Sequence, residues 1–93
     1  MADKPLHEGR NDLSDAILDR HRAIESLREE LEAVDWYDQR IAATKNEDLK
    51  RILIHNRDEE KEHAAMVIEW LRRHDAGFGK QCDEQLYRKD AEG

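Results

Sequence analysis

The chain has 93 residues, of which 42% are charged and 38% hydrophobic, and its formal net charge is -7. This length limits it to one domain, and the apolar content is low for a small domain that must build its own core. We therefore expect another chain to complete the core. Nucleic-acid binders need a basic face, whereas lysine and arginine are scattered among acidic residues here, so we exclude nucleic-acid binding. The acidic excess fits both a cation-handling protein and an ordinary solvated helical surface.

Export and membrane signals are also missing from the sequence. Cys82 is the only cysteine, so neither an intrachain disulfide nor a cysteine-based zinc motif is expected. Residues 1–9 are polar and contain Pro5, unlike a signal peptide. No apolar run approaches the length needed to span a membrane. We expect a cytoplasmic protein with no membrane partner.

The first predicted element is a polar N-terminal arm over residues 1–11, which contains Pro5 and Gly9 and is expected to be flexible. Asn11, Asp12 and Ser14 follow, and all three are good helix caps. Apolar residues then recur at spacings of three, four and seven, which predicts one long helix to about residue 43. These residues are Leu13, Ile17, Ile24, Leu27, Leu31, Val34 and Ile41.

A second long helix is predicted to follow almost at once. Thr44 with Glu47 fits a capping box, and Asn46 is the alternative cap. The apolar face of this helix carries Leu49, Ile52, Leu53, Val67, Trp70 and Leu71. We expect the helix to end near residue 74, because two glycines follow at positions 77 and 79.

The predicted fold class is all-α, with two helices of about 30 residues, or about 45 Å, each. A link of two or three residues makes them an antiparallel hairpin over residues 12–76. Such a hairpin leaves a broad apolar stripe uncovered, and pairing two copies into a four-helix bundle covers it. Residues 77–93 form a C-terminal tail, in which a short third helix is predicted over Gln81–Asp90.

Polar residues interrupt the apolar face of the second helix. At 100° per residue, Asn56, Glu60 and His63 fall in the same sector as its leucines. A carboxylate facing a core is unfavourable unless it is paired, protonated or metal-bound. Because Glu60 and His63 are three residues apart, both can reach one point, and that donor pair suits iron, manganese or zinc. The alternative is a buried Glu–His ion pair.

The first helix carries a matching carboxylate. Glu30 lies on the edge of its apolar stripe, and Tyr37 stands one heptad later on the same edge. In the hairpin, Glu30 lies about 15 residues before the link and Glu60 about 15 after it, at the same height. Two copies would supply two lone glutamates and two Glu-x-x-His pairs, which is the ligand set of ferritin-like di-iron sites. We therefore predict a dinuclear metal site between two subunits.

Two stretches resemble the encapsulated ferritin family. They are Glu29–Arg40 and His55–Met66, the latter continued by Glu69–Arg73, and the resemblance covers roughly residues 20–76. It implies a ferritin-like bundle and a ferroxidase that oxidises Fe(II) to Fe(III) with oxygen. Two iron ions per dimer would be held by Glu30, Glu60 and His63 from both subunits, with Tyr37 beside the site.

The resemblance implies further features that the residue pattern does not supply. Glu29 and Glu32 would form a second, weaker metal site near Trp36, on the path to the first. The helical wheel puts both on a different face from Glu30, and the alternative is a solvated charged face. The dimers would form a ring of ten inside an encapsulin nanocompartment, which would store the iron. No shell-docking peptide is recognisable in residues 80–93.

Three other functions remain open at this point. They are a metal-binding or metal-sensing dimer without turnover, a plain dimerisation hairpin with a Glu60–His63 ion pair, and a rubrerythrin-like peroxidase. Rubrerythrins usually need a cysteine-ligated iron as well, which Cys82 alone cannot supply. The other histidines are interpreted as surface or helix-end residues, namely His7, His21, His55 and His74. Arg72, Arg73 and the tail are candidates for a second interface in a ring.

Overall fold

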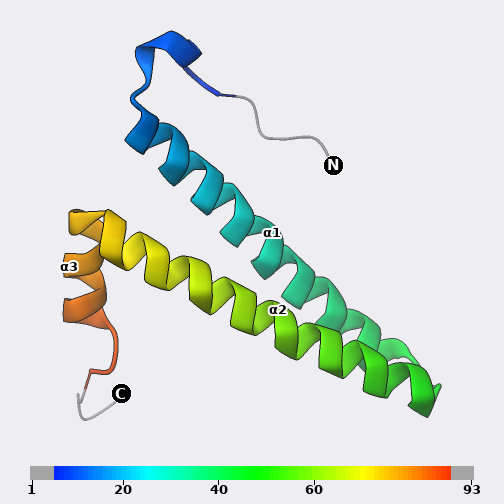
Figure 1. The fold of residues 1–93 in the computed structure, drawn as a ribbon. Coiled ribbons are helices and arrows are strands. Elements are labelled where there is room, and N and C mark those ends of the chain that lie inside the picture. The colour runs from blue at the N-terminus through cyan, green and yellow to red at the C-terminus, as the bar shows by residue number, and fades with distance from the viewer. Residues whose placement is uncertain (1–5, 89–93) are drawn as a thin grey trace.

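The protein is an open helical hairpin with a short third helix. The structure is a computed structural model, and it describes residues 6–88. A 3-10 turn, η1 (Arg10–Asp12), precedes α1 (Asp15–Ala43), α2 (Glu47–His74) and α3 (Ala76–Gln85). No strand occurs within residues 6–88. α1 and α2 run antiparallel and diverge away from their link, and α3 turns off the end of α2 (Figure 1). The all-α prediction is confirmed.

Local hydrogen bonds fix where the first two helices begin. The Ser14 hydroxyl accepts from the Ile17 N–H at 3.2 Å and caps α1. The Asn46 side chain accepts from the Leu49 N–H at 2.9 Å and caps α2. The capping box predicted at Thr44 is wrong, because Thr44 ends α1 and its hydroxyl accepts from the Asn46 N–H at 3.2 Å. The link is therefore residues 44–46, as short as predicted.

The third helix lies earlier in the chain than predicted. It begins at Ala76 and ends at Gln85, whereas the sequence favoured Gln81–Asp90; Asp90 itself lies outside the described residues. Asp75 is the only residue between α2 and α3, and its carboxylate accepts from the Phe78 N–H at 3.1 Å. Residues 77 and 79 do not break the helix, although both are glycines. A Cβ on Gly79 would lie 2.6 Å from the Arg72 carbonyl oxygen, so this glycine permits close packing of α3 on α2.

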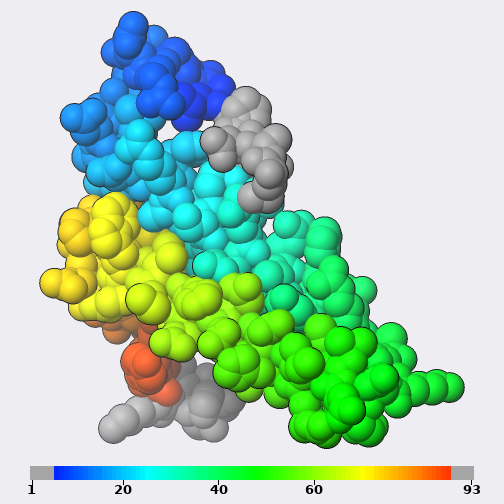
Figure 2. Space-filling view, turned by 45° about the vertical axis from the view of Figure 1, so that its right-hand side comes forward, coloured from blue at the N-terminus to red at the C-terminus, as the bar shows by residue number. Residues whose placement is uncertain are grey.

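The hairpin is thin and has almost no core of its own. Its principal extents are 50 × 42 × 17 Å, and the space-filling view shows an irregular, elongated outline rather than a ball (Figure 2). Among the described residues, the buried hydrophobic ones are Leu18, Ala64, Leu71 and Cys82. The exposed large hydrophobic residues are Ile17, Ile24, Leu31, Trp36, Leu49, Ile52, Met66, Phe78, Leu86 and Tyr87. None of the helices within residues 6–88 has the length and apolar character needed to cross a bilayer. Exposed apolar surface of this extent is typical of interaction sites.

The exposed apolar residues gather on two sides of the hairpin. We call the side that carries Glu30, Glu60 and His63 the site flank, and Ile52, Met66 and Trp70 share it by helical periodicity. We call the other side the opposite flank, and it carries Ile17, Ile24 and Leu31 at seven-residue spacing. On the opposite flank, Arg57 Nη1 lies 3.0 Å from Asp38 Oδ1 and ties α2 to α1.

Candidate metal centre

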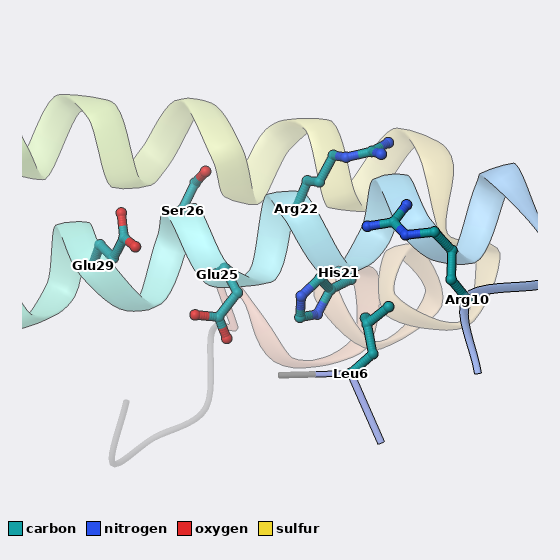
Figure 3. A pocket seen from close by; sticks show the side chains of 7 residues that line it. All are labelled: Leu6, Arg10, His21, Arg22, Glu25, Ser26 and Glu29. Carbon is teal, nitrogen blue, oxygen red and sulfur yellow. The ribbon is translucent and has the colours of Figure 1, made fainter. Parts of the chain in front are cut away.

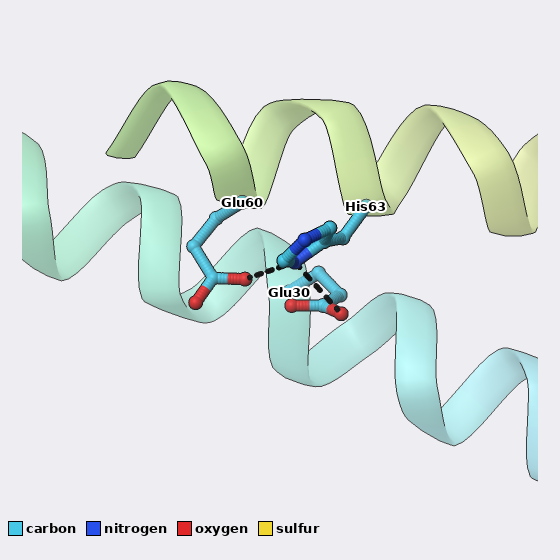
Figure 4. Close-up of side chains that lie close together, drawn as sticks. All are labelled: Glu30, Glu60 and His63. Carbon is cyan, nitrogen blue, oxygen red and sulfur yellow. Dashed lines mark hydrogen bonds and ion pairs between the residues drawn. The ribbon is translucent and has the colours of Figure 1, made fainter. Parts of the chain in front are cut away.

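Three predicted ligands meet on the site flank, and we call them the Glu–Glu–His cluster. Glu30 comes from the middle of α1, and Glu60 and His63 from successive turns of α2 (Figure 4). His63 Nδ1 lies 3.2 Å from a Glu60 carboxylate oxygen and 3.8 Å from a Glu30 oxygen. One ligand atom from each residue lies within 4.8 Å of the other two, and no other such group of three occurs within residues 6–88. The short link brings the two helix midpoints to the same height.

Each group of the Glu–Glu–His cluster changes the pKa of its neighbours. A hydrogen bond with the Glu60 carboxyl group, then burial and then the negative charge of Glu60, raise the pKa of Glu30 to about 7. The same hydrogen bond, followed by one with His63, lowers the pKa of Glu60. In turn, the hydrogen bond with Glu60 raises the pKa of His63. The two carboxyl groups thus hold a proton between them near neutral pH, and a bound cation would displace it.

The cluster is open to solvent rather than enclosed between α1 and α2. The exposed fractions of the side chains are 27% for Glu30, 25% for Glu60 and 49% for His63. The sequence placed Glu60 and His63 at the centre of the inward face, but within one chain His63 points out of the site flank. Three donors are fewer than the four to six that divalent transition metals commonly take. The remaining donors must come from outside this chain or from solvent.

Tyr37 lies near the cluster but is not part of it. It is half-buried on the site flank, about two turns of α1 beyond Glu30. The Arg40 guanidinium carbon lies 5.6 Å from the centre of the Tyr37 ring and 5.7 Å from that of the Trp36 ring. These are cation–π distances. Arg40 was not predicted from the sequence, although its spacing of three and four residues from the two aromatic residues was a usable signal.

Glu29 and Glu32 lie on the side of α1 that faces away from α2. Glu29 lines a hollow of about 310 Å³ beside the N-terminal segment (Figure 3). The other lining residues are Leu6, Arg10, His21, Arg22, Glu25 and Ser26. A Glu32 carboxylate oxygen lies 3.9 Å from Nη1 of Arg28. The other terminal nitrogen of Arg28, Nη2, lies 3.0 Å from a Glu25 carboxylate oxygen. Within residues 6–88 these carboxylates belong to no group of three candidate ligands, so they are separate from the Glu–Glu–His cluster.

The remaining histidines also stand apart from the cluster. His21 borders the N-terminal hollow, and His7 is exposed. His55 Nε2 lies 3.3 Å from a Glu59 oxygen on the outer face of α2. His74 stacks on Trp70 with ring centres 4.4 Å apart, and its Nδ1 lies 2.9 Å from the Trp70 carbonyl oxygen. His63 alone among the described histidines faces the two carboxylates.

Comparison with known proteins gives strong matches. The model of a family described as EncFtn-like matches residues 5–89. The chain is 56% identical over 81 residues to a Rhodospirillum rubrum protein named encapsulated ferritin-like protein, covering 87% of this chain and 58% of that one. It is 48% identical over 63 residues to the Myxococcus xanthus encapsulin nanocompartment cargo protein EncC, covering 64% of this chain and 48% of that one.

A solved structure matches the whole described fold. The crystal structure of a Nitrosomonas europaea protein superposes with a TM-score of 0.88 at 55% identity, covering 94% of this chain and 96% of that one. By contrast, the chain spans only 58% and 48% of the length of the Rhodospirillum and Myxococcus relatives. The match to the family model over residues 5–89 includes the whole hairpin and the Glu–Glu–His cluster.

Proposed function

The chain belongs to the EncFtn-like family of encapsulated ferritin-like proteins, and from this premise we propose that it is a ferroxidase. Two copies would together oxidise Fe(II) to Fe(III) with oxygen. The observation that carries the proposal is the Glu–Glu–His cluster, which presents two carboxylates and an imidazole on an open apolar flank. An incomplete ligand set beside exposed apolar residues fits a site that a second copy completes.

The chemistry follows from duplicating the cluster about a two-fold axis. Two copies supply four carboxylates and two imidazoles, which is the ligand set of ferritin-like di-iron proteins. Two Fe(II) ions would bind per dimer as substrate and give their electrons to one oxygen molecule together. Hard carboxylate oxygens bind Fe(III) more tightly than Fe(II) and so favour oxidation.

Metal binding should also strengthen the dimer. Glu30 shares a proton with Glu60 near pH 7, and Fe(II) would release that proton. Without metal, the acidic groups of two copies would repel each other across the axis. A ligand that binds only the assembled form stabilises it by mass action. Light scattering with and without anaerobic Fe(II) measures this coupling, and assembly independent of iron would contradict it.

The surrounding residues take supporting roles in the proposal. Tyr37 would sit beside the di-iron site, with Arg40 against its ring. Glu29 and Glu32 would form a weaker metal site near Trp36, where iron binds on its way to the oxidation site. Two carboxylates from one chain are too few for a tight site, which fits a transient role.

The opposite flank supports a second kind of contact between copies. Ile17, Ile24 and Leu31 are 42%, 51% and 52% exposed there. Two different interfaces on one hairpin allow a closed ring, and we propose the ring of ten. Arg72 and Arg73 are both exposed near the end of α2, and Arg72 is held by Glu69 at 2.7 Å.

The compartment is proposed from the relatives. The Rhodospirillum relative is named encapsulated and the Myxococcus relative is named an encapsulin cargo protein. We propose that this chain likewise works inside an encapsulin shell in the cytoplasm. A hairpin 17 Å thick encloses no storage cavity, so the shell would hold the Fe(III) that the protein produces.

The decisive experiment is aerobic Fe(II) oxidation followed by absorbance, with oligomeric state measured alongside. We expect Glu60→Ala and His63→Ala to slow oxidation more than about 100-fold, because even residues that only support ligands are worth 10- to 100-fold. His55→Ala is the matched control, since His55 lies on the outer face of the same helix. Repeated turnover lost in both variants, and kept in the control, supports the ferroxidase.

The 3.2 Å contact between Glu60 and His63 is an ion pair when His63 is protonated. It favours a second candidate function, a dimerisation hairpin in which this ion pair takes the place of a metal site. One stoichiometric oxidation without turnover would indicate a metal-binding or metal-sensing dimer. A purified protein that binds no iron would indicate a dimerisation hairpin. These outcomes separate the alternatives without further variants.

A further inference from the structure

A shallow groove lies on the site flank, apart from the Glu–Glu–His cluster. Its volume is about 480 Å³, and it opens between α1 and the C-terminal half of α2. It is lined by Asp19, Arg22, Ala23, Ser26, Met66, Val67 and Trp70. Asp19 and Arg22 pair with each other at 2.6 Å, so they do not call for a charged ligand. What the groove offers is apolar surface, including Met66 at 63% exposure.

One wall of the groove is held in place by stacking. The Trp70 ring lies 4.4 Å from the His74 ring at an interplanar angle of 15°. The His74 ring nitrogen is in turn within 2.9 Å of the Trp70 carbonyl oxygen. A fixed aromatic wall beside a flexible Met66 suits an aliphatic side chain.

The groove and one exposed isoleucine lie on opposite sides of the cluster at similar distances. Along α1, Ala23 precedes Glu30 by about 10 Å, and along α2, Trp70 lies about 13 Å past the middle of the Glu60–His63 pair. In the other direction, Ile52 lies about 14 Å from that middle, toward the link. Ile52 is 58% exposed and on the same flank.

Two-fold symmetry brings these features together. This step rests on the proposed function, in which two copies share the cluster. A two-fold axis through the cluster that lies in the plane of the flank and runs across the helices turns the two flanks toward each other, reverses the helix direction and places α2 of one copy over α2 of the other. The part of α2 that carries Ile52 then lies over the part that carries Trp70 in the other copy. We propose that Ile52 of each copy docks in the groove of the other, against Trp70.

This contact makes Ile52 a positioning residue for a site that it does not touch. Each dimer would contain the contact twice, once on each side of the axis. The pair of contacts fixes how closely the two clusters approach and excludes water on both sides of them. It also explains why a polar helix exposes an isoleucine where only a second copy can cover it.

A cysteine pair tests the docking directly. In a Cys82→Ser background, Ile52→Cys is combined with Trp70→Cys in the full chain. Within one chain these two positions lie about 27 Å apart along α2, beyond the Cα separation of about 4.4–6.8 Å that a disulfide allows. Mild oxidation should therefore give a covalent dimer on non-reducing gels, and neither single variant should. The control pair joins Ile52→Cys to Glu69→Cys, which lies on the outer face of α2 at nearly the height of Trp70, and should not cross-link. No cross-link in the assembled protein overturns the docking.

Asparagine variants provide a second measurement. We expect Ile52→Asn to slow Fe(II) oxidation about tenfold at low protein concentration, with recovery as the concentration rises. His55→Asn, on the outer face of the same helix, should retain the rate at every concentration. Equal effects of the two substitutions would contradict the proposal.

The docking and the proposed function can fail separately. A covalent dimer that oxidises iron only once keeps the docking and removes the ferroxidase. Loss of turnover in Glu60→Ala without any cross-link in the cysteine pair keeps the ferroxidase and removes the docking.

Discussion

Glu29 and Glu30 are neighbours in the sequence and lie in different environments. Glu30 shares a proton with Glu60 and faces His63, and its pKa is raised to about 7. Glu29 borders a hollow of mixed charge on the far side of α1. A rotation of 100° about the helix axis separates them. A carboxylate becomes a candidate ligand here because a second helix brings donors to the same point, and acidity alone does not achieve this.

The largest effect is expected when Glu30 and Glu29 are replaced by alanine one at a time. We expect Glu30→Ala to lower Fe(II) oxidation more than about 100-fold, because it removes a direct ligand. Glu29→Ala should raise the iron concentration needed for half-maximal rate and leave the maximal rate within about threefold, because a weak site on the path affects delivery and not chemistry. Initial rates over a range of Fe(II) concentrations measure both. Equal losses of maximal rate would show that the two faces form one site.

The environment of Glu30 also depends on the position of α2 beside α1, and the packing of α3 on α2 supports that position. Gly79→Ala should destabilise the protein by about 1–3 kcal/mol, because its Cβ would meet the Arg72 backbone oxygen at 2.6 Å. Gly77→Ala is the control, since its Cβ would meet only the Asp75 side chain, at 3.6 Å. That change should be neutral or stabilising within the helix. Urea unfolding measures both, and similar midpoints would refute close packing of α3.

The raised pKa of Glu30 predicts that the unfolding free energy of the metal-free protein depends on pH. The folded state favours protonated Glu30, since its pKa lies near 7 against a usual 4.5. This stabilisation is therefore complete below pH 4.5 and is lost as the pH rises to 7. In metal-free protein, Glu30→Gln should flatten the fall in unfolding free energy over that range. Parallel curves for the variant and the wild type would contradict the shared proton.

The smallest expected effect concerns Arg40, whose guanidinium group lies against the rings of Trp36 and Tyr37. Cation–π contacts at exposed positions contribute about 0.5–1 kcal/mol, so Arg40→Met should lower stability by no more than that. Losing the contact should also shift the tryptophan emission of a Trp70→Phe background, in which Trp36 is the only tryptophan. Arg51→Met is the control, because Arg51 pairs only with Asp48 among the described residues. An unchanged spectrum would show that Arg40 does not hold Trp36.

The hairpin was predictable because its signals are local. Apolar spacing, the capping residues and a three-residue link determine two long antiparallel helices, and Ser14 caps the first as expected. The third helix was misplaced because Gly77 and Gly79 were interpreted as helix breakers. Only the close approach of α3 to the Arg72 carbonyl explains why a glycine stands inside that helix.

For the candidate site, the sequence by itself determined which residues share a height and a face. The spacing of Glu60 and His63, with Glu30 equally far from the link, pointed to one cluster, and the structure brings these three together. Only the tertiary structure decided that the cluster opens outward and that Glu30 holds a proton near neutral pH. It also showed that Arg40 spans two aromatic rings. Periodicity gives the direction of a side chain about its own helix axis, whereas exposure and pKa depend on what the neighbouring helix places there.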